Sequence, residues 1–267
     1  ASVKQSSGRS NGNTPSANIK LYNLSQSTLN RMVGNAAVVL KAGFDTDVEL
    51  PLIFVGQVER VFTNRVGSDN VTTLLCKEAS NPLKNVIFNK SFPENQTYNF
   101  ILLQIIKAFQ DNGVPLGGFE ESDRSIQSIT EASAYNNKVG KVLSEVCDEI
   151  DYLWFISKGR LYVQPKELDR PTEFVTIAPQ NVIGTIRPND DKTALAAKDK
   201  NSKASGIKVD TFLNGEVGLN TYIKISEGAF EGDYKPDSIE HKLNWYSGPW
   251  QTSIQSQRIK EFATNTI

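Results

Sequence analysis

Apolar residues recur at every second position in several stretches of the first 80 residues, and this period is that of a strand with one buried face. Ser25 is placed to cap a short helix over residues 25–33. Gly56 lies inside the longest of these runs and indicates a bulge or a sharp bend. The order strand, helix, strand, strand, strand predicts a small barrel or sandwich over residues 1–80. The expected strands are 19–24, 36–44, 50–65 and 71–79.

The apolar period changes to that of helices between residues 81 and 168, where two helices and a hairpin are expected. The first helix has Thr97 as a cap, Gly113 as a stop and apolar residues around a wide arc, which predicts burial. The second helix leads into a hairpin that turns at Lys158 and Gly159. The expected ranges are 97–113 and 138–150 for the helices and 151–165 for the hairpin.

Short strands return from residue 169 onward, separated by clusters of Gly, Asn, Asp and Pro, and such a succession is typical of an all-β barrel. The segment 190–206 breaks the pattern, because Leu195 is its only large apolar residue. It cannot bury enough apolar surface to order itself, so we expect a mobile loop or a segment ordered by a partner. The expected strands are 174–179, 181–188, 206–214, 221–226, 238–245 and 250–259.

The fold class expected from these patterns is mainly β with an α/β insert. Two antiparallel β-barrels, at 1–80 and 169–267, are joined by a helix-plus-hairpin unit at 81–168. The sequence starts at Ala1 without a methionine and is already in strand register at SVKQS. We therefore expect that the first domain is incomplete at its N-terminus.

Composition narrows the classes of function. The 29 basic and 30 acidic side chains give a net charge of −1, so the chain lacks the basic excess with which proteins bind nucleic-acid phosphates, and sequence-specific nucleic-acid binding is not expected. The apolar runs are far shorter than the about 20 residues that span a bilayer, so no membrane span is expected. Cys76 and Cys147 are far apart in the sequence and, with a single histidine, offer no metal-binding spacing.

His241 is the only histidine, so nucleophilic catalysis of the Ser-His or Cys-His type would depend on it. Strand alternation puts His241 in line with Ile239 and Leu243, which favours a half-buried structural histidine. The neighbouring aromatic residues Trp245, Tyr246 and Trp250 could form a carbohydrate platform in a receptor- or sugar-binding protein. Around a WYSGPW turn, however, such residues more often pack over the end of a barrel.

Paired carboxylates are the remaining route to catalysis, as in glycoside hydrolysis, where one acid sits in an apolar pocket. Glu120, Glu121 and Asp123 lie together in the Gly-flanked loop GGFEESDRS, but a solvated acidic loop explains them without chemistry. A peptidoglycan-cleaving enzyme is the alternative to a protein without catalytic activity. We expect no catalytic, cofactor-binding or metal-binding residues, and no enzyme activity.

Several stretches of the sequence, taken in order, resemble one known family. The run NIKLYNLS is followed by AVVLKAGF, LPLIFVGQVERV and VTTLLCKEA; KVLSEVCDEIDYLWFISKGRLYVQP occupies the middle, and GIKVDTFLNGEVGLNTYIKI and GDYKPDSIEHKLNWYSGPWQTSI the last third. Over nearly the whole chain these stretches resemble phage baseplate hub proteins, which include the late-control hub proteins of contractile-tailed phages and the hub portion of the VgrG spike of type VI secretion. The chain departs from the family pattern at Asn214 and Gly215, where proline is usual.

The resemblance implies that both barrels are tail-tube-like and that the chain is a homotrimer, whose six barrels form a pseudo-hexameric ring. Such a ring adapts the sixfold tail tube to the threefold central spike and lets DNA pass, and near-neutral charge suits that passage. The implied partners are the tail tube, central spike, tape measure and other baseplate proteins, in a virion tail baseplate assembled in the host bacterial cytoplasm. The family's hub is a scaffold without catalytic residues. A hub of a type VI secretion system or of a phage-tail-like bacteriocin is the alternative within the family.

Overall fold

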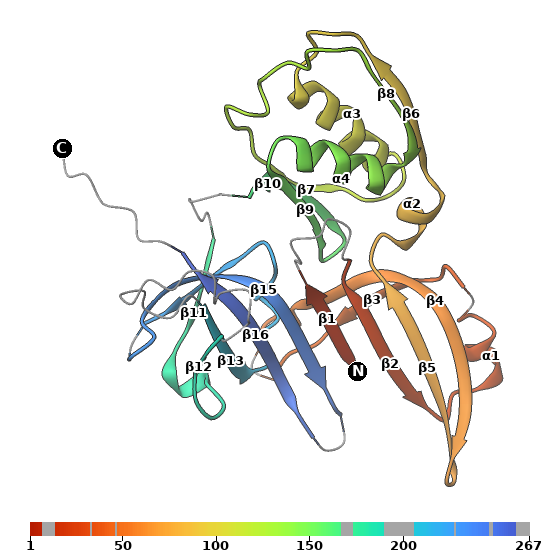
Figure 1. Ribbon diagram of the computed structural model, residues 1–267. Helices are drawn as coiled ribbons and strands as arrows, with labels where there is room; N and C mark the ends of the chain where they lie inside the picture. Colours follow the sequence, from red (N-terminus) through yellow and green to blue (C-terminus); the bar gives the residue numbers. More distant parts are fainter. Residues whose placement is uncertain are drawn as a thin grey trace. The chain divides into compact units, whose positions relative to one another are not determined.

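The computed structural model divides the chain into two compact units, Ala1–Leu168 and Asp169–Ile267, which are described one at a time (Figure 1). The predicted domain at 1–80 and the predicted α/β domain at 81–168 both lie within the first unit. The segment expected to be mobile, 190–206, lies outside the described residues except for Gly206. The structure describes residues 1–6, 14–32, 34–45, 47–166, 173–189, 206–226, 228–245 and 248–259.

The first unit begins with an antiparallel sheet in the order β1-β2-β5-β4-β3. One face of this sheet is apolar, with Ile19 opposite Leu74 and Ala17 opposite Cys76, as the alternation predicted. Ser25 caps the short helix α1, its Oγ accepting the backbone N–H of Thr28. The bounds are Ser2–Ser6 for β1, Ser16–Tyr22 for β2, Gln26–Leu29 for α1, Ala37–Lys41 for β3, Leu52–Val66 for β4 and Asp69–Lys77 for β5.

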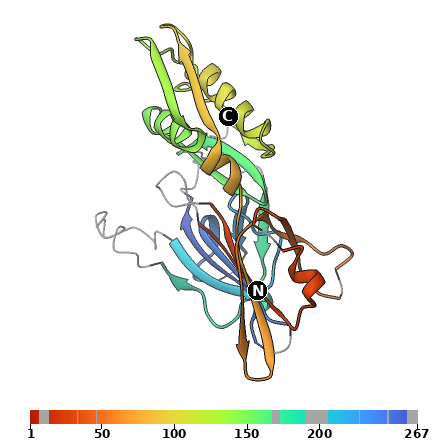
Figure 2. The ribbon, with the colours of Figure 1, turned by 90° about the vertical axis from the view of Figure 1, so that its right-hand side faces the viewer.

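The predicted bulge of the long strand β4 is not at Gly56. The pairing register of β4 with β5 shifts between Val58 and Arg60, so Glu59 is an extra residue there, and the register of β4 with β3 shifts at Ile53. Gly56 is needed for packing instead, because a Cβ there would lie 2.5 Å from Cζ of Phe54 and 2.6 Å from the carbonyl oxygen of Lys77. Figure 2 shows the β4–β5 pair as a long ribbon that projects beyond the rest of the sheet.

The helical part of the first unit has a core of its own. Helix α3 buries Ile101, Leu102, Ile105, Ile106 and Phe109, the apolar arc that predicted its burial, and Thr97 caps it by accepting the N–H of Phe100. Helix α4 packs against α3, and the β6–β8 ribbon runs alongside both helices (Figures 1 and 2). The bounds are Ser80–Asn85 for α2, Ile87–Phe92 for β6, Tyr98–Gln110 for α3, Ser133–Lys138 for β8 and Val139–Glu149 for α4.

A three-stranded sheet completes this core, with β10 between β9 (Tyr152–Ser157) and β7 (Leu116–Phe119). Strand β10 (Arg160–Pro165) is antiparallel to β9 and parallel to β7. The predicted hairpin turn is confirmed: Lys158 and Gly159 have φ angles of 52° and 76°, the positive values that a two-residue type I′ turn requires.

The second unit is a sheet in the order β12-β13-β16-β15-β14-β11, antiparallel except for the β14–β11 pair. Its buried face includes Ile207, Val209 and Ile254. The predicted strand 181–188 is wrong over most of its length, because Pro179 begins a short 3-10 helix and Gly184, with φ of 76°, turns the chain. The bounds are Phe174–Ile177 for β11, Arg187–Pro188 for β12, Gly206–Phe212 for β13, Tyr222–Ile225 for β14, Gly232–Leu243 for β15 and Trp250–Arg258 for β16.

The fold is therefore mainly β with antiparallel sheets and a helical insert, as predicted, but within the described residues the strands of neither unit close into a barrel. Alternation indicates which face of a strand is buried, whereas closure depends on whether the two edge strands of a sheet meet. In the part of the chain that is described, no helix is long and apolar enough to cross a membrane.

Candidate functional site

The loop after β7 carries the three acidic residues that were candidates for catalysis. Glu121 and Asp123 are exposed and Glu120 is half-buried. Glu121 accepts a hydrogen bond of 2.6 Å from Nδ2 of Asn99. A general acid of a glycosidase needs a desolvated carboxyl, and Glu121 and Asp123 lie in water instead. The arrangement around these two carboxylates is that of a solvated acidic loop.

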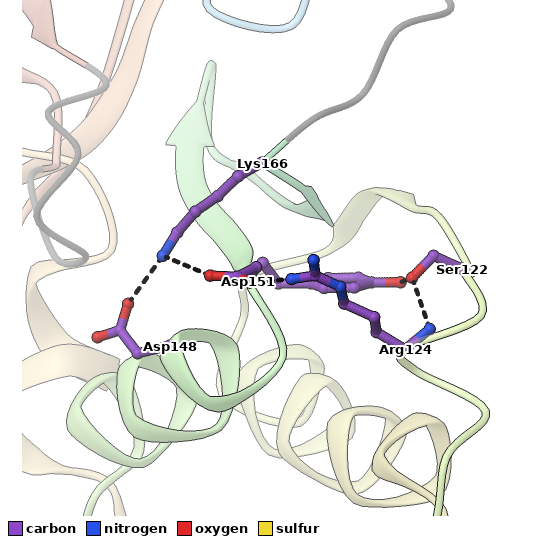
Figure 3. Close-up of polar contacts among 6 residues, drawn as sticks. Ser122, Arg124, Asp148, Asp151 and Lys166 are labelled. Carbon is purple, nitrogen blue, oxygen red and sulfur yellow. Dashed lines mark hydrogen bonds and ion pairs between the residues drawn. The ribbon is translucent and has the colours of Figure 1, made fainter.

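A cluster of polar contacts anchors this loop to the end of α4 and to β9 (Figure 3). The hydroxyl of Tyr152 lies 2.9 Å from the carbonyl oxygen of Glu120 and 3.0 Å from Oγ of Ser122. Arg124 forms an ion pair with Asp151. On the far side, Lys166 lies 3.4 Å from Asp148 and 4.0 Å from Asp151 (Figure 3). These ion pairs are largely exposed, so each adds at most about 1 kcal/mol, and their effect is to hold the loop in place.

His241 lies on the buried face of β15 between Ile239 and Leu243 and is fully buried, not half-buried as expected. Its Nδ1 is 2.9 Å from Oγ1 of Thr252, the residue opposite it on β16. The same Thr252 oxygen accepts the backbone N–H of Asn214 at 2.9 Å. The histidine thus belongs to a buried polar network that ties the loop after β13 to the end of the sheet, and water does not reach it.

The tryptophans near His241 do not pack together over the end of a barrel as expected. Trp245 is 84% exposed just beyond the end of β15, whereas Trp250 is half-buried opposite Leu243 at the start of β16. Tyr246, the third member of the expected cluster, lies outside the described residues.

The two cysteines are free and buried, and burial raises the pKa of both thiols, that of Cys76 to about 11. Both are therefore neutral core residues at physiological pH. Within the described ranges, no three His, Cys, Asp or Glu side chains are grouped as metal ligands would be.

A joint between the first sheet and the helical part was not predicted. The term joint is used here for the contacts that Val55, Gln57, Glu59 and Glu78 make with α2 and with the Lys158–Gly159 turn. Its first half uses the bulged residue Glu59, whose Oε1 lies 2.5 Å from Nζ of Lys84 and accepts the hydroxyl of Ser80 at 2.6 Å, both on α2. Hydrogen bonds from Lys84 and Ser80 lower the pKa of Glu59. The bulge thus directs an ionised carboxylate at α2.

The second half of the joint holds the tip of the β9–β10 hairpin. Glu78 is fully buried at the end of β5, and its Oε2 accepts the backbone N–H of Gly159 at 3.0 Å. Burial raises the pKa of Glu78 to about 7, although hydrogen bonds from the backbone of Gly159 and Val55 and the charge of Lys158 oppose this shift. The signal in the sequence is its position, since Leu74, Cys76 and Glu78 follow one another at the strand period on the buried face.

No known family model matches the sequence, and no curated protein sequence is significantly similar to it. Solved structures do match. The 43 kDa tail protein of prophage MuSo2 from Shewanella oneidensis aligns with a TM-score of 0.62 at 11% identity, over 96% of this chain and 93% of that one. A tail protein from Neisseria meningitidis aligns with a TM-score of 0.61 at 8% identity, over 96% and 91%.

A component of the type VI secretion system of E. coli, described as structurally similar to the bacteriophage T4 tail proteins gp27 and gp5, aligns with a TM-score of 0.64 at 9% identity. The alignment covers 97% of this chain and 73% of that protein. These likenesses extend over both units, and the proteins concerned are the kind that the sequence motifs resemble. The chain therefore has the fold of phage tail proteins and of this related secretion component.

Proposed function

We propose that the chain is the structural hub of a phage tail baseplate, in a tail of the contractile type. The observation that carries this proposal is the likeness to tail proteins along nearly the whole chain, the same extent of chain over which the hub-like sequence motifs are found. Fold alone does not define a function, but here a separate signal from the sequence points to the same family.

In this role three copies form a pseudo-hexameric ring between the sixfold tail tube and the threefold spike. Each copy supplies two sheets, and in the ring these become the two tube-like barrels. Strand β3 ends the sheet of the first unit within the described residues, so its outer edge suits pairing with a neighbouring chain. The net charge of −1 suits a lumen through which DNA slides without binding. The partners are then the tube, spike, tape measure and other baseplate proteins, and the virion tail is the location, after assembly in the host cytoplasm.

A hub of a type VI secretion system is the second candidate, because the E. coli component matches over almost all of this chain. The ring is common to both candidates. Finding the chain in purified virions would favour the phage hub, and finding it only in secretion particles would favour the second candidate.

The ring predicts a closed trimer held by one repeated heterologous interface. Native mass spectrometry of the purified chain, together with imaging of tail tips that contain it, should give three copies and threefold symmetry. A sixfold ring of this chain, or a single copy per tail, would rule out the proposed adaptor.

We also propose that the hub does not cleave peptidoglycan, since Glu121 and Asp123 are solvated. Purified chain incubated with isolated cell walls should release no soluble fragments, and the variants Glu120→Gln and Glu121→Gln should behave like the unchanged protein. Fragment release that either variant abolishes would establish the enzyme instead.

A further inference from the structure

Glu78 occupies the contact between two parts of the first unit that are far apart in the sequence. Its buried carboxyl group accepts a hydrogen bond from the backbone N–H of Gly159, which lies at the tip of the β9–β10 hairpin, 81 positions further along the chain. The same tip is packed tightly, because a Cβ on Gly159 would lie 3.1 Å from Cβ of Val55 on β4. The second carboxyl oxygen of Glu78, Oε1, is buried and makes no hydrogen bond of normal geometry to any described residue.

The charged groups around Glu78 do not offset the effect of burial on the pKa of its carboxyl. Lys158 is the cation that favours its ionised form, but burial outweighs this attraction. Glu59 and Lys84 are paired with each other, and Cys76 is a neutral thiol. The titratable and charged side chains on the surrounding elements are Glu59, Arg60 and Arg65 on β4, Asp69, Cys76 and Lys77 on β5, Lys84 on α2, Tyr152, Arg160 and Tyr162 on the hairpin strands, and Lys158 in the hairpin turn.

We propose that Glu78 makes the joint pH-responsive where the β9–β10 turn contacts the first sheet. This contact is closed when the Glu78 carboxyl carries a proton, and it opens more often when the carboxyl is ionised. A neutral carboxyl keeps an acceptor for the Gly159 N–H and loses little by burial. An ionised carboxylate loses its hydration there and regains it only when the hairpin tip moves away. The joint has this property whatever the assembly in which the chain works.

The direction of the effect follows from proton binding. In the closed joint the pKa of Glu78 is about 7, and in an open, hydrated joint it returns to its ordinary value of 4.5. Between these pH values the closed state therefore binds more protons than the open state. The stabilisation that the neutral carboxyl gives the closed state is fully present below pH 4.5 and is lost as pH rises through about 7. From about pH 5.5 to about pH 8 the population of the open joint should rise on the order of 30-fold.

Hydrogen exchange of the Gly159 amide in the full chain, followed by NMR and corrected for the intrinsic rate, tests the proposal. Its protection should fall on the order of 30-fold between about pH 5.5 and about pH 8. The amides of Ile105 and Ile106 in α3 should keep their protection. A Gly159 amide whose protection does not change with pH, or one whose loss is matched by the α3 amides, would overturn the proposal.

Two variants separate Glu78 from the other carboxylates. Glu78→Gln keeps the acceptor and the shape but cannot ionise, so protection of Gly159 should no longer depend on pH. Glu121→Gln removes an exposed carboxylate of the same unit and should leave the pH dependence unchanged. If Glu78→Gln does not fold, the carboxyl carbon of Glu78 in the unchanged protein gives the answer by NMR. Titration near pH 7 supports the joint, and titration near the ordinary value of 4.5 refutes it.

Discussion

Replacing Leu102 by alanine should lower the free energy of unfolding of the first unit by about 3 kcal/mol. Leu102 is fully buried in α3, in the core that also contains Phe109 and Trp154. Removing three carbons from such a site loses their transfer free energy and leaves a cavity that a rigid core closes only in part. Urea unfolding, followed by the fluorescence of Trp154 in a protein whose Trp245 and Trp250 are replaced by Phe, measures the loss in this core.

Leu103→Ala is the matched control. Leu103 is the next residue on the same helix but is 43% exposed, so the same truncation should cost less than about 1 kcal/mol. Helix propensity changes equally in the two variants, because both replace Leu by Ala in the interior of α3. Equal losses for the two variants would mean that the buried arc of α3 is misplaced by about one residue.

Local signals explain why α3 was predicted correctly. A side-chain cap at Thr97 and an apolar arc at the helical period both lie within about four turns of chain, and both act before any distant contact forms. The type I′ turn at Lys158 and Gly159 was predicted for the same reason, since the conformation is set by two adjacent residues.

Elements that depend on distant contacts were missed or misplaced. Strand β7 has the sequence LGGF, and two glycines argue against a strand. Gly117 is required by Tyr162 on β10, because a Cβ at Gly117 would lie 2.4 Å from Cζ of that ring. Strand β8, SAYNNK, carries almost no apolar signal and is held by pairing with β6. Whether the two edge strands of a sheet meet likewise depends on contacts that the alternation of apolar residues does not encode.

The candidate sites show the same difference between features set by local signals and features set by distant contacts. The alternation placed His241 on the apolar face correctly but underestimated its burial. Its link to the loop after β13 runs through Thr252, which contacts His241 and accepts the backbone N–H of Asn214. Glu78 stood on the buried line of β5 in the sequence, yet its role required knowing that Gly159 would reach it. A carboxylate at a buried strand position is thus a signal of a distant contact, although it does not identify the partner.

Replacing Thr252 by valine should destabilise the second unit by about 2 to 4 kcal/mol, although valine has nearly the same shape. The Thr252 hydroxyl serves two groups at once, the buried Nδ1 atom of His241 and the backbone N–H of the half-buried Asn214. Valine removes the hydrogen bond from both groups, and such a loss at a fully buried group like His241 Nδ1 costs about 1 to 3 kcal/mol. Thr252→Ser keeps the hydroxyl and should retain most of the stability, which separates the hydrogen bonds from the lost methyl group.

Ser253→Ala is the control on the same strand. Ser253 follows Thr252, is half-buried and faces the opposite side of the sheet, between Asp210 and Glu240, so its loss should cost less than about 1 kcal/mol. Denaturant unfolding followed by the fluorescence of Trp250, two residues before Thr252, in a protein whose Trp154 and Trp245 are replaced by Phe, reports on this region directly. Wild-type stability in Thr252→Val would show that His241 and Asn214 do not depend on the hydroxyl. An equally large loss of stability in Thr252→Ser would assign the effect to packing. A stability that increases from the Val variant to the Ser variant to the wild type would identify His241 as part of a structural network that fastens the loop to the sheet.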